Sequence, residues 1–597
     1  MRTLPVCFYL FVLWQAGRIM AGISANNRIL DESGRDEAEM KSGANRKAQA
    51  PGTGSAAGQP PGSAPLGLAD TVAQSLINLQ TELGGSPDLK IRRIRLGGDS
   101  RIEAAAVHLS GLADTVAVNE FVIGSLLDNT DDLLRDKQED GAGASREQSP
   151  LPQVILSRAL AIGDAVLQEE WKEIMLAILS GDTAILMEGC LEAIICDTRG
   201  GEQRAVSEPS SQLVVRGPKD GFVESVATNI SLIRRRIKSS KLHLEVMKIG
   251  SETHTHVALM YMKGVAGEDL VQEVRERLRK ITLNEVLESG FIEELIQDKT
   301  FTPFPTIYNS ERPDVAAGNL LEGRVVIIVD GTPFVLILPA VFTQFFQSAE
   351  DYSQRFDIAI LMRLVRYVSF LVLILGPSVY LALTTYHYEM IPTTLLINLL
   401  SQRENVPFPA FVELLLMETA FEILREAGVR MPRAIGQTVS VVGALILGTA
   451  VVEAGIIAPI MVIVVALTGI ASFAIPAYNM AIAGRIIRFA FLILASLFGF
   501  YGITLGLIVF VAHMNSLRSF GVPYLFPFVP LSVNGQKDTI LRLPLWIVGR
   551  DKTPKQMSKE LPEYMQLTTG HDEQLPPLIL KNDTPASRGM EGENDEK

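Results

Sequence analysis

The stretch GRVVIIVDGTPFVLILPAVF, residues 323–342, decides where a soluble head gives way to a membrane domain. Hydropathy alone would make it a membrane-spanning helix, because it is long and almost wholly apolar. Asp330-Gly331 between two β-branched runs is, however, the strongest short-range signal for a β-hairpin. We therefore predict two antiparallel strands here and place the membrane helices only after this hairpin.

Charge is distributed unevenly along the chain. The 597 residues carry a formal net charge of −13, and the charged side chains gather in the first 360 positions and the last 60. So long a chain exceeds a single domain, and its acidic balance argues against nucleic acid as a partner, because nucleic-acid binding needs a basic surface. The distribution predicts a soluble head, a membrane body and a polar tail.

Two segments of the head resemble each other. AAAVHLSGLADTVAVNEFVIGSLL, residues 104–127, and VALMYMKGVAGEDLVQEVRERL, residues 257–278, both show an apolar strand, a turn containing Gly111 or Gly264, and then a helix. A duplicated strand-turn-helix unit predicts an α+β head built from two related α/β subdomains. An all-α polytopic membrane domain is expected to follow it.

The chain divides into six predicted stretches. The N-terminal run MRTLPVCFYLFVLW fits a secretory signal, a small anchor or a misassigned start codon, and the Gly-, Ala-, Pro- and Ser-rich stretch after it buries too little apolar surface to fold. The predicted stretches are a disordered lead (1–67), the first head subdomain (68–135), a linker (136–150), the second head subdomain with the hairpin (151–346), the membrane domain (347–530) and a polar C-terminal tail (531–597).

Apolar runs in the membrane domain predict about four to six membrane segments. Residues 367–386 have the length of one crossing. Residues 435–477 are long enough for two, and Gly455 and Pro459 mark the turn between them. The run at 486–514 exceeds the thickness of the hydrocarbon core, so it is expected to tilt or to break near its glycines at 499, 502 and 506.

The segment at 407–427 is expected to form an amphipathic helix rather than an apolar one. At 100° per residue its charged side chains share one face, and these are Glu418, Glu422, Arg425 and Glu426. Such a helix either lies in the membrane interface or lines an aqueous cavity with its charged face inward. Arg430 and Arg433 follow it, and this basic end is either a cytoplasmic anchor or part of a gate.

Glu453 is a lone carboxylate in the apolar stretch 443–465. Since the run around it turns near Gly455, Glu453 is expected near the far surface of the bilayer rather than at mid-depth. It then either joins a ring of carboxylates at a pore mouth or faces headgroups and water. The full set of predicted pore or gating residues is Glu413, Glu418, Glu422, Arg425, Glu426, Arg430, Arg433 and Glu453.

The sequence gives no support for catalysis or for a cofactor. It shows no phosphate loop, nucleophile elbow or zinc signature, and His254 and His256 lack an evident third metal ligand. Cys190 and Cys196 fall in apolar sequence and are expected to be inert thiols. Charged residues, glycines and prolines in the proline-rich turns and the hairpin of the head are instead assigned structural or coupling roles: Arg216, Gly217, Pro218, Pro303, Pro305, Glu311, Arg312, Pro313, Asp314, Asp330 and Gly331.

Five stretches make the chain recognisable. They are RGPKDGFVESVATNISLIRRRI (216–237), FTPFPTIYNSERPD (301–314), VDGTPFVLILP (329–339), VPFPAFVELLLMETAFEILREAGVRMPRAIGQTVSVVGALILG (406–448) and SFGVPYLFP (519–527). Together they resemble the A subunit of the GerA family of spore germination proteins, from about residue 70 to 532. The resemblance does not cover the N-terminal extension.

The resemblance implies a multi-pass protein of the spore inner membrane with its head and tail in the cytoplasm. It implies a B-type partner similar to amino-acid transporters, a C-type lipoprotein partner, and self-association as a ring. The expected activity is a nutrient-gated cation channel, with no enzymatic function, metal or cofactor. Because acidic rings favour cations, Glu418, Glu422 and Glu453 are then expected to influence cation passage.

Three alternatives stay open at this point. A related branch, encoded with dipicolinate-release proteins, looks alike but amplifies germination rather than senses nutrients. A secondary transporter would use helices broken near Gly376-Pro377 or between Gly455 and Pro459 to hold a solute. A membrane scaffold would have no pore at all.

Overall fold

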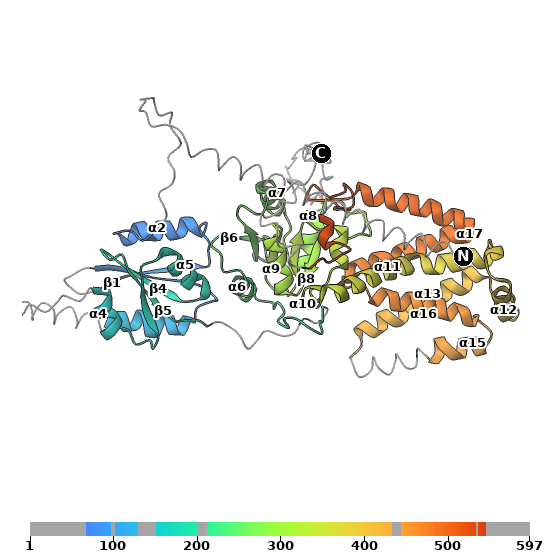
Figure 1. Ribbon diagram of the computed structural model, residues 1–597, viewed down its shortest axis with the longest axis horizontal. Coiled ribbons are helices and arrows are strands. Elements are labelled where there is room, and N and C mark those ends of the chain that lie inside the picture. Colours follow the sequence, from blue (N-terminus) through green and yellow to red (C-terminus); the bar gives the residue numbers. More distant parts are fainter. Residues whose placement is uncertain are drawn as a thin grey trace, which may run out of the picture.

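The computed structural model describes residues 67–96, 102–128, 151–200, 209, 212–432, 443, 445–532 and 535–544. The predicted lead, except residue 67, and the predicted linker at 136–150 lie outside these residues. Figure 1 shows an elongated molecule, with two α/β units toward one end and a helical bundle toward the other. The predicted fold class, two related α/β subdomains followed by a helical membrane domain, is confirmed.

The first unit is a five-stranded antiparallel sheet in the order β1-β2-β4-β5-β3. Alternate residues of its strands face opposite layers: Ala105 and Val107 pack under α2 and α5, and Ala104 and Ala106 pack under η1 and α4. The elements are α2 (Val72–Glu82), β1 (Leu89–Leu96), β2 (Ile102–Leu109), η1 (Ala117–Gly124), α4 (Leu151–Arg158), β3 (Ala165–Gln168), α5 (Trp171–Ser180), β4 (Thr183–Met187) and β5 (Ala193–Cys196).

The second unit is also a five-stranded antiparallel sheet, in the order β6-β7-β9-β10-β8. Ala258 and Met260 of β7 face α6 and α9, while Val257 and Leu259 face α7 and α8. The elements are α6 (Val226–Arg236), β6 (Leu242–Ile249), β7 (Thr255–Met262), α7 (Glu268–Arg279), α8 (Ser289–Ile296), β8 (Tyr308–Ser310), α9 (Pro313–Leu321), β9 (Val325–Val329) and β10 (Val335–Leu338).

The two units repeat each other strand by strand, so the predicted duplication is confirmed and extends over a whole sheet. The helices that precede β4 and β9 end in the same way, at Gly181 (φ 104°) and Gly323 (φ 89°). A Cβ atom on either glycine would lie 2.8 Å from a carbonyl oxygen, that of Leu112 or Val265. Only glycine fits both the left-handed backbone and this close approach.

The hairpin turn also has a counterpart in the first unit. Asp330 Oδ1 accepts a hydrogen bond of 3.0 Å from the amide of Val226, the first residue of α6. Glu188 Oε2 accepts one of 2.8 Å from the amide of Val72, the first residue of α2. In each unit a turn carboxylate therefore satisfies an amide at a helix N-terminus, where negative charge is favourable.

The predicted hairpin is confirmed, because β9 and β10 pair antiparallel on either side of Asp330-Gly331. The predicted subdomain boundary at 136–150 is wrong. β1 and β2 precede that segment and β3, β4 and β5 follow it, yet all five strands form one sheet. The second sheet begins only with β6, so the division falls between β5 and β6. The boundary between the subdomains is set by strand pairing between segments that are distant in the sequence. The local composition of the chain therefore does not indicate it.

The helical domain begins at α11, and its described residues include two helices that are long and apolar enough to cross a membrane, α11 and α17. In Figure 1, α12 and α15 lie at the end of the bundle away from the head. The elements are α11 (Phe356–Thr385), α12 (Thr393–Arg403), α13 (Ala410–Arg430), η5 (Ile446–Ala450), α15 (Val451–Glu453), α16 (Pro459–Phe473) and α17 (Tyr478–Ser516).

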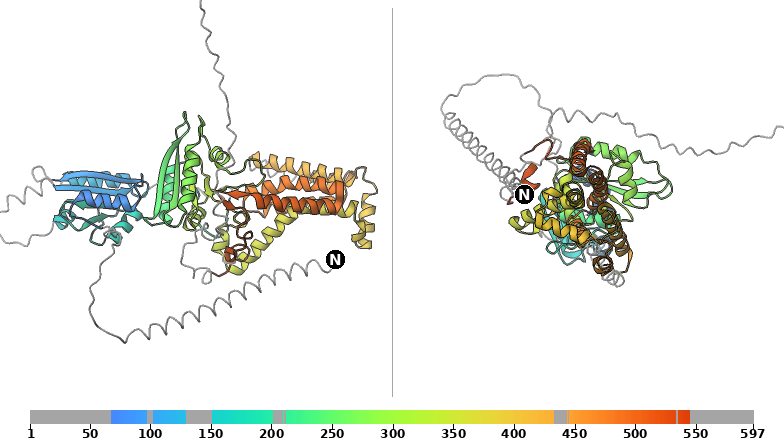
Figure 2. Two further views of the ribbon diagram at one scale, coloured as in Figure 1. Left: turned by 90° about the horizontal axis from the view of Figure 1, so that it is seen from above. Right: turned by 90° about the vertical axis from the view of Figure 1, so that its right-hand side faces the viewer.

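Helix α17 reverses direction at Gly499, which has φ 57° and ψ −136°. The two halves pack against each other, since the Phe491 and Phe510 rings lie 6.3 Å apart and a Cβ on Gly506 would lie 2.8 Å from Phe491 Cε1. The halves run side by side in Figure 2. Of the two expectations, tilting or breaking, the structure shows the break.

The predicted turn near Gly455 is confirmed as well. Positions 443 and 469 both lie against α13, touching Leu424 and Phe421 respectively, so the chain runs out and back between them. Gly455 has φ 66° at the turn, and α16 starts with Pro459 as its first residue. Glu453 is therefore exposed at the end of the bundle away from the head.

Gly323→Ala is expected to destabilise the protein by about 1–3 kcal/mol, because the new methyl group meets the Val265 carbonyl and the left-handed backbone disfavours alanine. Thermal unfolding of the full chain in detergent measures this. Gly318→Ala is the matched control, since it lies inside α9 with nothing within 4 Å of a new Cβ. An equal melting temperature for the two variants would contradict the prediction.

Candidate functional site

A buried ion pair joins α13 to α17 in the middle of the helical domain. Arg488 Nη2 lies 2.9 Å from Glu418 Oε2, and the two side chains are 1% and 0% exposed. The same nitrogen lies 2.9 Å from Glu422 Oε1, one turn further along α13. An ion so far from water is tolerated only with a partner, and removing one partner is strongly destabilising.

Two more arginines complete this charge network, which consists of Glu418, Glu422, Arg425, Arg485 and Arg488. Arg485 Nη1 lies 2.8 Å from Glu422 Oε2. Arg425 Nη1 lies 3.5 Å from Glu422 Oε1, and its Nη2 donates a hydrogen bond of 2.6 Å to Ser472 Oγ of α16. The charge network thus ties three helices together.

Arginines outnumber carboxylates three to two in the charge network. The guanidinium of Arg425 also lies 5.0 Å and 4.9 Å from the ring centroids of Phe421 and Phe473, a favourable cation–π arrangement. Both carboxylates are thus paired in this conformation. The sequence suggests an acidic lining here, but the structure shows a set of ion pairs with a formal excess of one positive charge.

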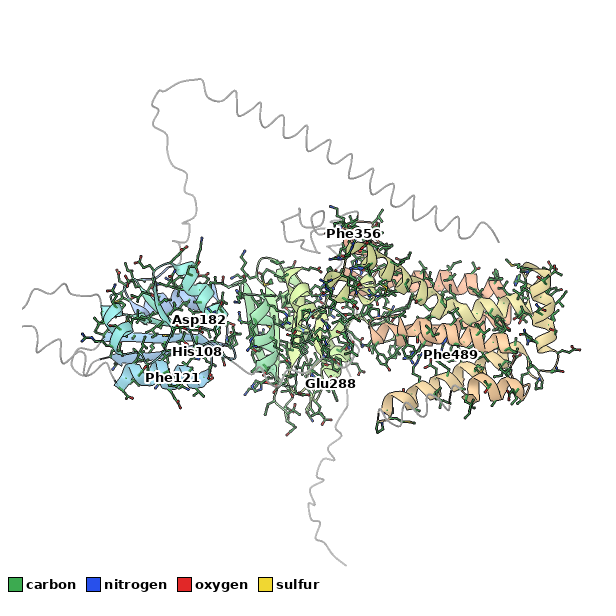
Figure 3. All side chains as sticks on the ribbon, turned by 60° about the horizontal axis from the view of Figure 1, so that its bottom comes forward. His108, Phe121, Asp182, Glu288, Phe356 and Phe489 are labelled. Carbon is green, nitrogen blue, oxygen red and sulfur yellow. The ribbon has the colours of Figure 1, made fainter. Side chains whose placement is uncertain are left out.

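Three of the four predicted charged residues of α13, Glu418, Glu422 and Arg425, point into the bundle, whereas Glu426 is exposed. Leu416 and Ile423 are exposed as well. Phe489 of α17, labelled in Figure 3, lies on the same side of the helical domain as the groove described next. A shallow groove of about 520 Å³ opens beside the charge network, lined by Thr419, Glu422, Ile423, Glu426, Ala427 and Phe489.

Arg485 and Arg488 are not among the residues predicted from the sequence. The signal is present in AGRIIRFAF, where two arginines three residues apart share one helix face inside apolar sequence. An ionisable group in such a run needs a partner of opposite sign, and the acidic face of α13 is the available one.

Glu413 lies outside the charge network but is equally buried. Its Oε2 accepts a hydrogen bond of 3.1 Å from the amide of Ala458 at the start of α16, and its Oε1 lies 3.0 Å from Arg403 Nη2 of α12. A carboxylate is favourable at a helix N-terminus. Glu413 therefore holds α12, α13 and α16 together at the end away from the head.

The remaining pore or gating candidates are not brought together with the charge network. Glu426 and Arg430 pair with each other at 2.7 Å, with side chains 61% and 79% exposed. Glu453 is exposed at its turn. Arg433 lies outside the described residues. Such exposed pairs contribute little to stability.

Arg312 organises the structural residues of the head. Its side chain is buried, and its Nη2 lies 2.7 Å from Asp314 Oδ2 and donates a hydrogen bond of 2.9 Å to the carbonyl of Pro218. A Cβ on Gly217 would lie 3.1 Å from Ser353 Oγ, just before α11. Arg216 is exposed beside it. The two proline-containing motifs therefore meet at the junction between head and helices.

The proline-flanked turn places Phe304 against the end of α17. The Phe304 ring lies 5.7 Å from that of Phe510, and Thr302 Oγ1 lies 3.0 Å from His513 Nε2. Further along, the Glu311 carbonyl accepts a hydrogen bond of 2.7 Å from Phe222, and Pro313 starts α9. Pro303 and Pro305 flank the buried Phe304 and restrict its backbone.

Residues 535–542, here called the clasp, contact the segment that connects the head to α11. This connecting segment, residues 347–355, is called the elbow. Arg363 is fully buried, with Nε 3.0 Å from Asp351 Oδ2 and Nη1 2.9 Å from Asp538 Oδ1. Arg366 Nη1 lies 2.7 Å from the same Asp351 oxygen. Arg542 Nη1 donates a hydrogen bond of 3.1 Å to the Gln354 carbonyl. This part of the predicted tail belongs to the junction.

Among the described residues, no cluster of His, Cys, Asp or Glu is arranged to hold a metal ion. Cys196 lies inside the first sheet, where burial raises the pKa of its thiol to about 12. The thiol therefore stays protonated near neutral pH, which makes it a poor nucleophile.

The duplicated head, the membrane-length helices and the buried ion pairs define an integral membrane protein with a folded domain outside the bilayer. The family model described as "Bacillus/Clostridium GerA spore germination protein" matches residues 77–554. Spore germination protein KA of Bacillus subtilis is 48% identical over 526 residues, 88% of this chain and 92% of that protein. Spore germination protein GerLA of Bacillus cereus is 37% identical over 84% of this chain and 97% of its own length.

The chain belongs to the GerA family of spore germination proteins, as an A subunit. Members of this family are receptor subunits and not enzymes. A solved structure, that of the N-terminal domain of the A subunit of the Bacillus megaterium spore germinant receptor GerK3, is 36% identical to this chain. It matches with a TM-score of 0.36 over 46% of this chain and 97% of that one.

Arg488→Met is expected to lower the stability of the full chain by about 3–5 kcal/mol, because it leaves the carboxylate of Glu418 buried without its partner. Thermal unfolding in detergent measures the loss. Arg430→Met is the control, since its exposed pair with Glu426 stabilises little. Equal melting temperatures for the two variants would show that the charge network does not hold the bundle.

Removal of the clasp is expected to loosen the elbow. A chain that ends after Ser532 lacks Asp538 and Arg542, so residues 347–355 should become sites of limited proteolysis in detergent-solubilised protein. A chain that ends after Pro544 keeps every clasp contact described here and should give the pattern of the full chain. Identical digestion of both shortened chains would refute the stabilising role of the clasp.

Proposed function

We propose that this chain is the A subunit of a nutrient germinant receptor and assembles as a ring into a germinant-gated cation channel in the spore inner membrane. Its family membership supports the role in germination. The charge network inside a bundle with membrane-length helices supports the channel, because ionisable groups in membrane segments mark ion paths or gates. A B-type transporter-like subunit and a C-type lipoprotein are its proposed partners.

The proposed crossings follow from the two reversals of the chain. They are α11, α13, the two crossings predicted for residues 435–477, of which α16 is the second, and the two halves of α17. The head and the clasp then lie on one side of the bilayer. Arg355, Arg363 and Arg366 beside α11 favour the cytoplasm for that side, by the positive-inside rule.

The charge network acts as a latch in this proposal. Glu418 and Glu422 are paired with arginines in the present conformation, so they offer no free negative charge to a cation. Separation of α13 from α17 would expose both carboxylates along one helix face, where they attract cations. The pairing thus describes a closed state, and the open state requires the latch to part.

The clasp offers a route from the head to the latch. Arg363 and Arg366 at the start of α11 are held by Asp351 of the head and Asp538 of the clasp. α11 packs in one core with α13, α16 and α17 further along. A change of the head that shifts this elbow would therefore move α11 against the helices that carry the latch.

Arg485→Gln tests the latch. It removes one partner of Glu422 and should raise basal potassium release from proteoliposomes severalfold in the absence of germinant, since the closed state loses a salt bridge. Arg430→Gln, on the exposed end of α13, should leave the basal release unchanged. Equal basal release by the parent chain and Arg485→Gln would count against the latch, and no conductance from any assembled receptor would count against the channel.

A further inference from the structure

The first sheet leaves two strand edges without a partner among the described residues. β1 pairs with β2 only, and β3 pairs with β5 only. Each outer edge presents backbone donors and acceptors that can pair with another strand. β1 offers eight residues and β3 offers four.

The two edges carry opposite charges. Along β1 the side chains of Lys90, Arg92, Arg93 and Arg95 are exposed. Beside β3 the exposed carboxylates are Asp164, Glu169, Glu170 and Glu173, together with a single exposed base, Lys172. None of these nine charged edge residues forms an ion pair with another described residue.

Opposite charge on the two edges favours one mode of association over the others. Two β1 edges repel each other, and so do two β3 edges, whereas β1 and β3 attract. Contact between unlike edges of two copies is heterologous, and heterologous contacts close into rings when the rotation between copies permits. Charges that merely protect an edge from pairing would not need to differ in sign.

The strand directions suit this contact. Four successive antiparallel pairings separate β1 from β3, so the two strands point the same way. A copy rotated about an axis along the strands therefore places its β3 beside β1 as a parallel pair. In Figure 2 the strands of the first sheet run along the long axis of the molecule, so its edges face sideways, toward neighbours in the plane of the membrane.

The second sheet lacks this complementarity. Its β8 edge is only three residues long, and Ser310 Oγ there donates a hydrogen bond of 2.7 Å to Gln212 Oε1 of the preceding segment. On its β6 edge, Glu245 pairs with Arg275 of the same unit at 2.6 Å. The duplicated units therefore differ at their edges, and only the first keeps two open edges of opposite charge among the described residues.

We propose that the first subdomain is a self-association module, in which the β1 edge of one copy docks on the β3 edge of a second copy. This inference rests on the proposed ring and assigns the contact that the heads make within it. The partner is thus a second copy of this chain, recognised by strand pairing and by the basic and acidic edges.

Cross-linking in the full chain tests the contact. Arg93→Cys and Val166→Cys are introduced together in a chain without its native cysteines, reconstituted in lipid nanodiscs, and treated with a short bis-maleimide. The expected product is a ladder of covalent oligomers, because each copy carries both edges. Either cysteine alone should give no ladder. A dimer as the only product would overturn the head-to-tail contact.

A second experiment reverses the charges on the two strand edges. Arg92→Glu with Arg93→Glu should reduce the association of heads at least tenfold, as measured by energy transfer between labelled first subdomains, and so should Glu169→Lys with Glu170→Lys. The four changes combined should restore it. Lys238→Glu with Lys280→Glu, on the second subdomain, is the charge-matched control. Failure of the four changes to restore association would overturn the proposal.

Native mass spectrometry of the same samples separates this inference from the proposed ring. An oligomer that forms without the cross-linked ladder refutes edge docking and leaves the ring intact, because the helical domains then assemble alone. If the chain stays monomeric even when its receptor partners are present, both the edge docking and the ring are refuted. An oligomer with the ladder supports both.

Discussion

The helical domain depends on one constraint: the guanidinium of Arg488 must find negative charge in a place that water does not reach. Glu418 supplies it, and with this pair fixed the opposing faces of α13 and α17 are fixed as well. Arg425 then extends the contact to α16. A bundle held by dispersion alone could slide by small steps, whereas ionic partners at defined positions permit few arrangements. The rest of the bundle, including the reversal at Gly499, is built around that register.

The head contains two copies of one folding unit, and the two copies differ in their edges and contacts. Both copies keep the features that close the sheet, namely the glycine after the helix and the carboxylate in the turn. They differ where the sheet ends. The edges of the second copy carry no comparable pair of opposite charges, and this copy is attached to the membrane helices, while the edges of the first copy are basic on one side and acidic on the other. The shared features thus close each sheet, and the differences lie at its edges.

Local chemistry predicted the hairpin, the duplication and the turn at Gly455, because each depends on a few consecutive residues with strong conformational preferences. The prediction of the subdomain boundary was wrong because β2 pairs with β4 across more than seventy positions of sequence. No local sequence signal indicates that pairing. The acidic face of α13 was recognised, but its arginine partners were missed, because the pairing depends on which helices become neighbours. The clasp escaped prediction for the same reason.

The clasp also constrains the order in which the protein can mature. Asp538 completes the surroundings of Arg363, yet the two residues are 175 positions apart. During synthesis α11 must therefore be delivered to the bilayer long before its elbow can close, and until then Arg363 has only Asp351 as a counter-ion. All helices of the bundle from α11 to α17 are therefore synthesised before the contact between Arg363 and Asp538 can form, so the elbow is the last part of the junction to close.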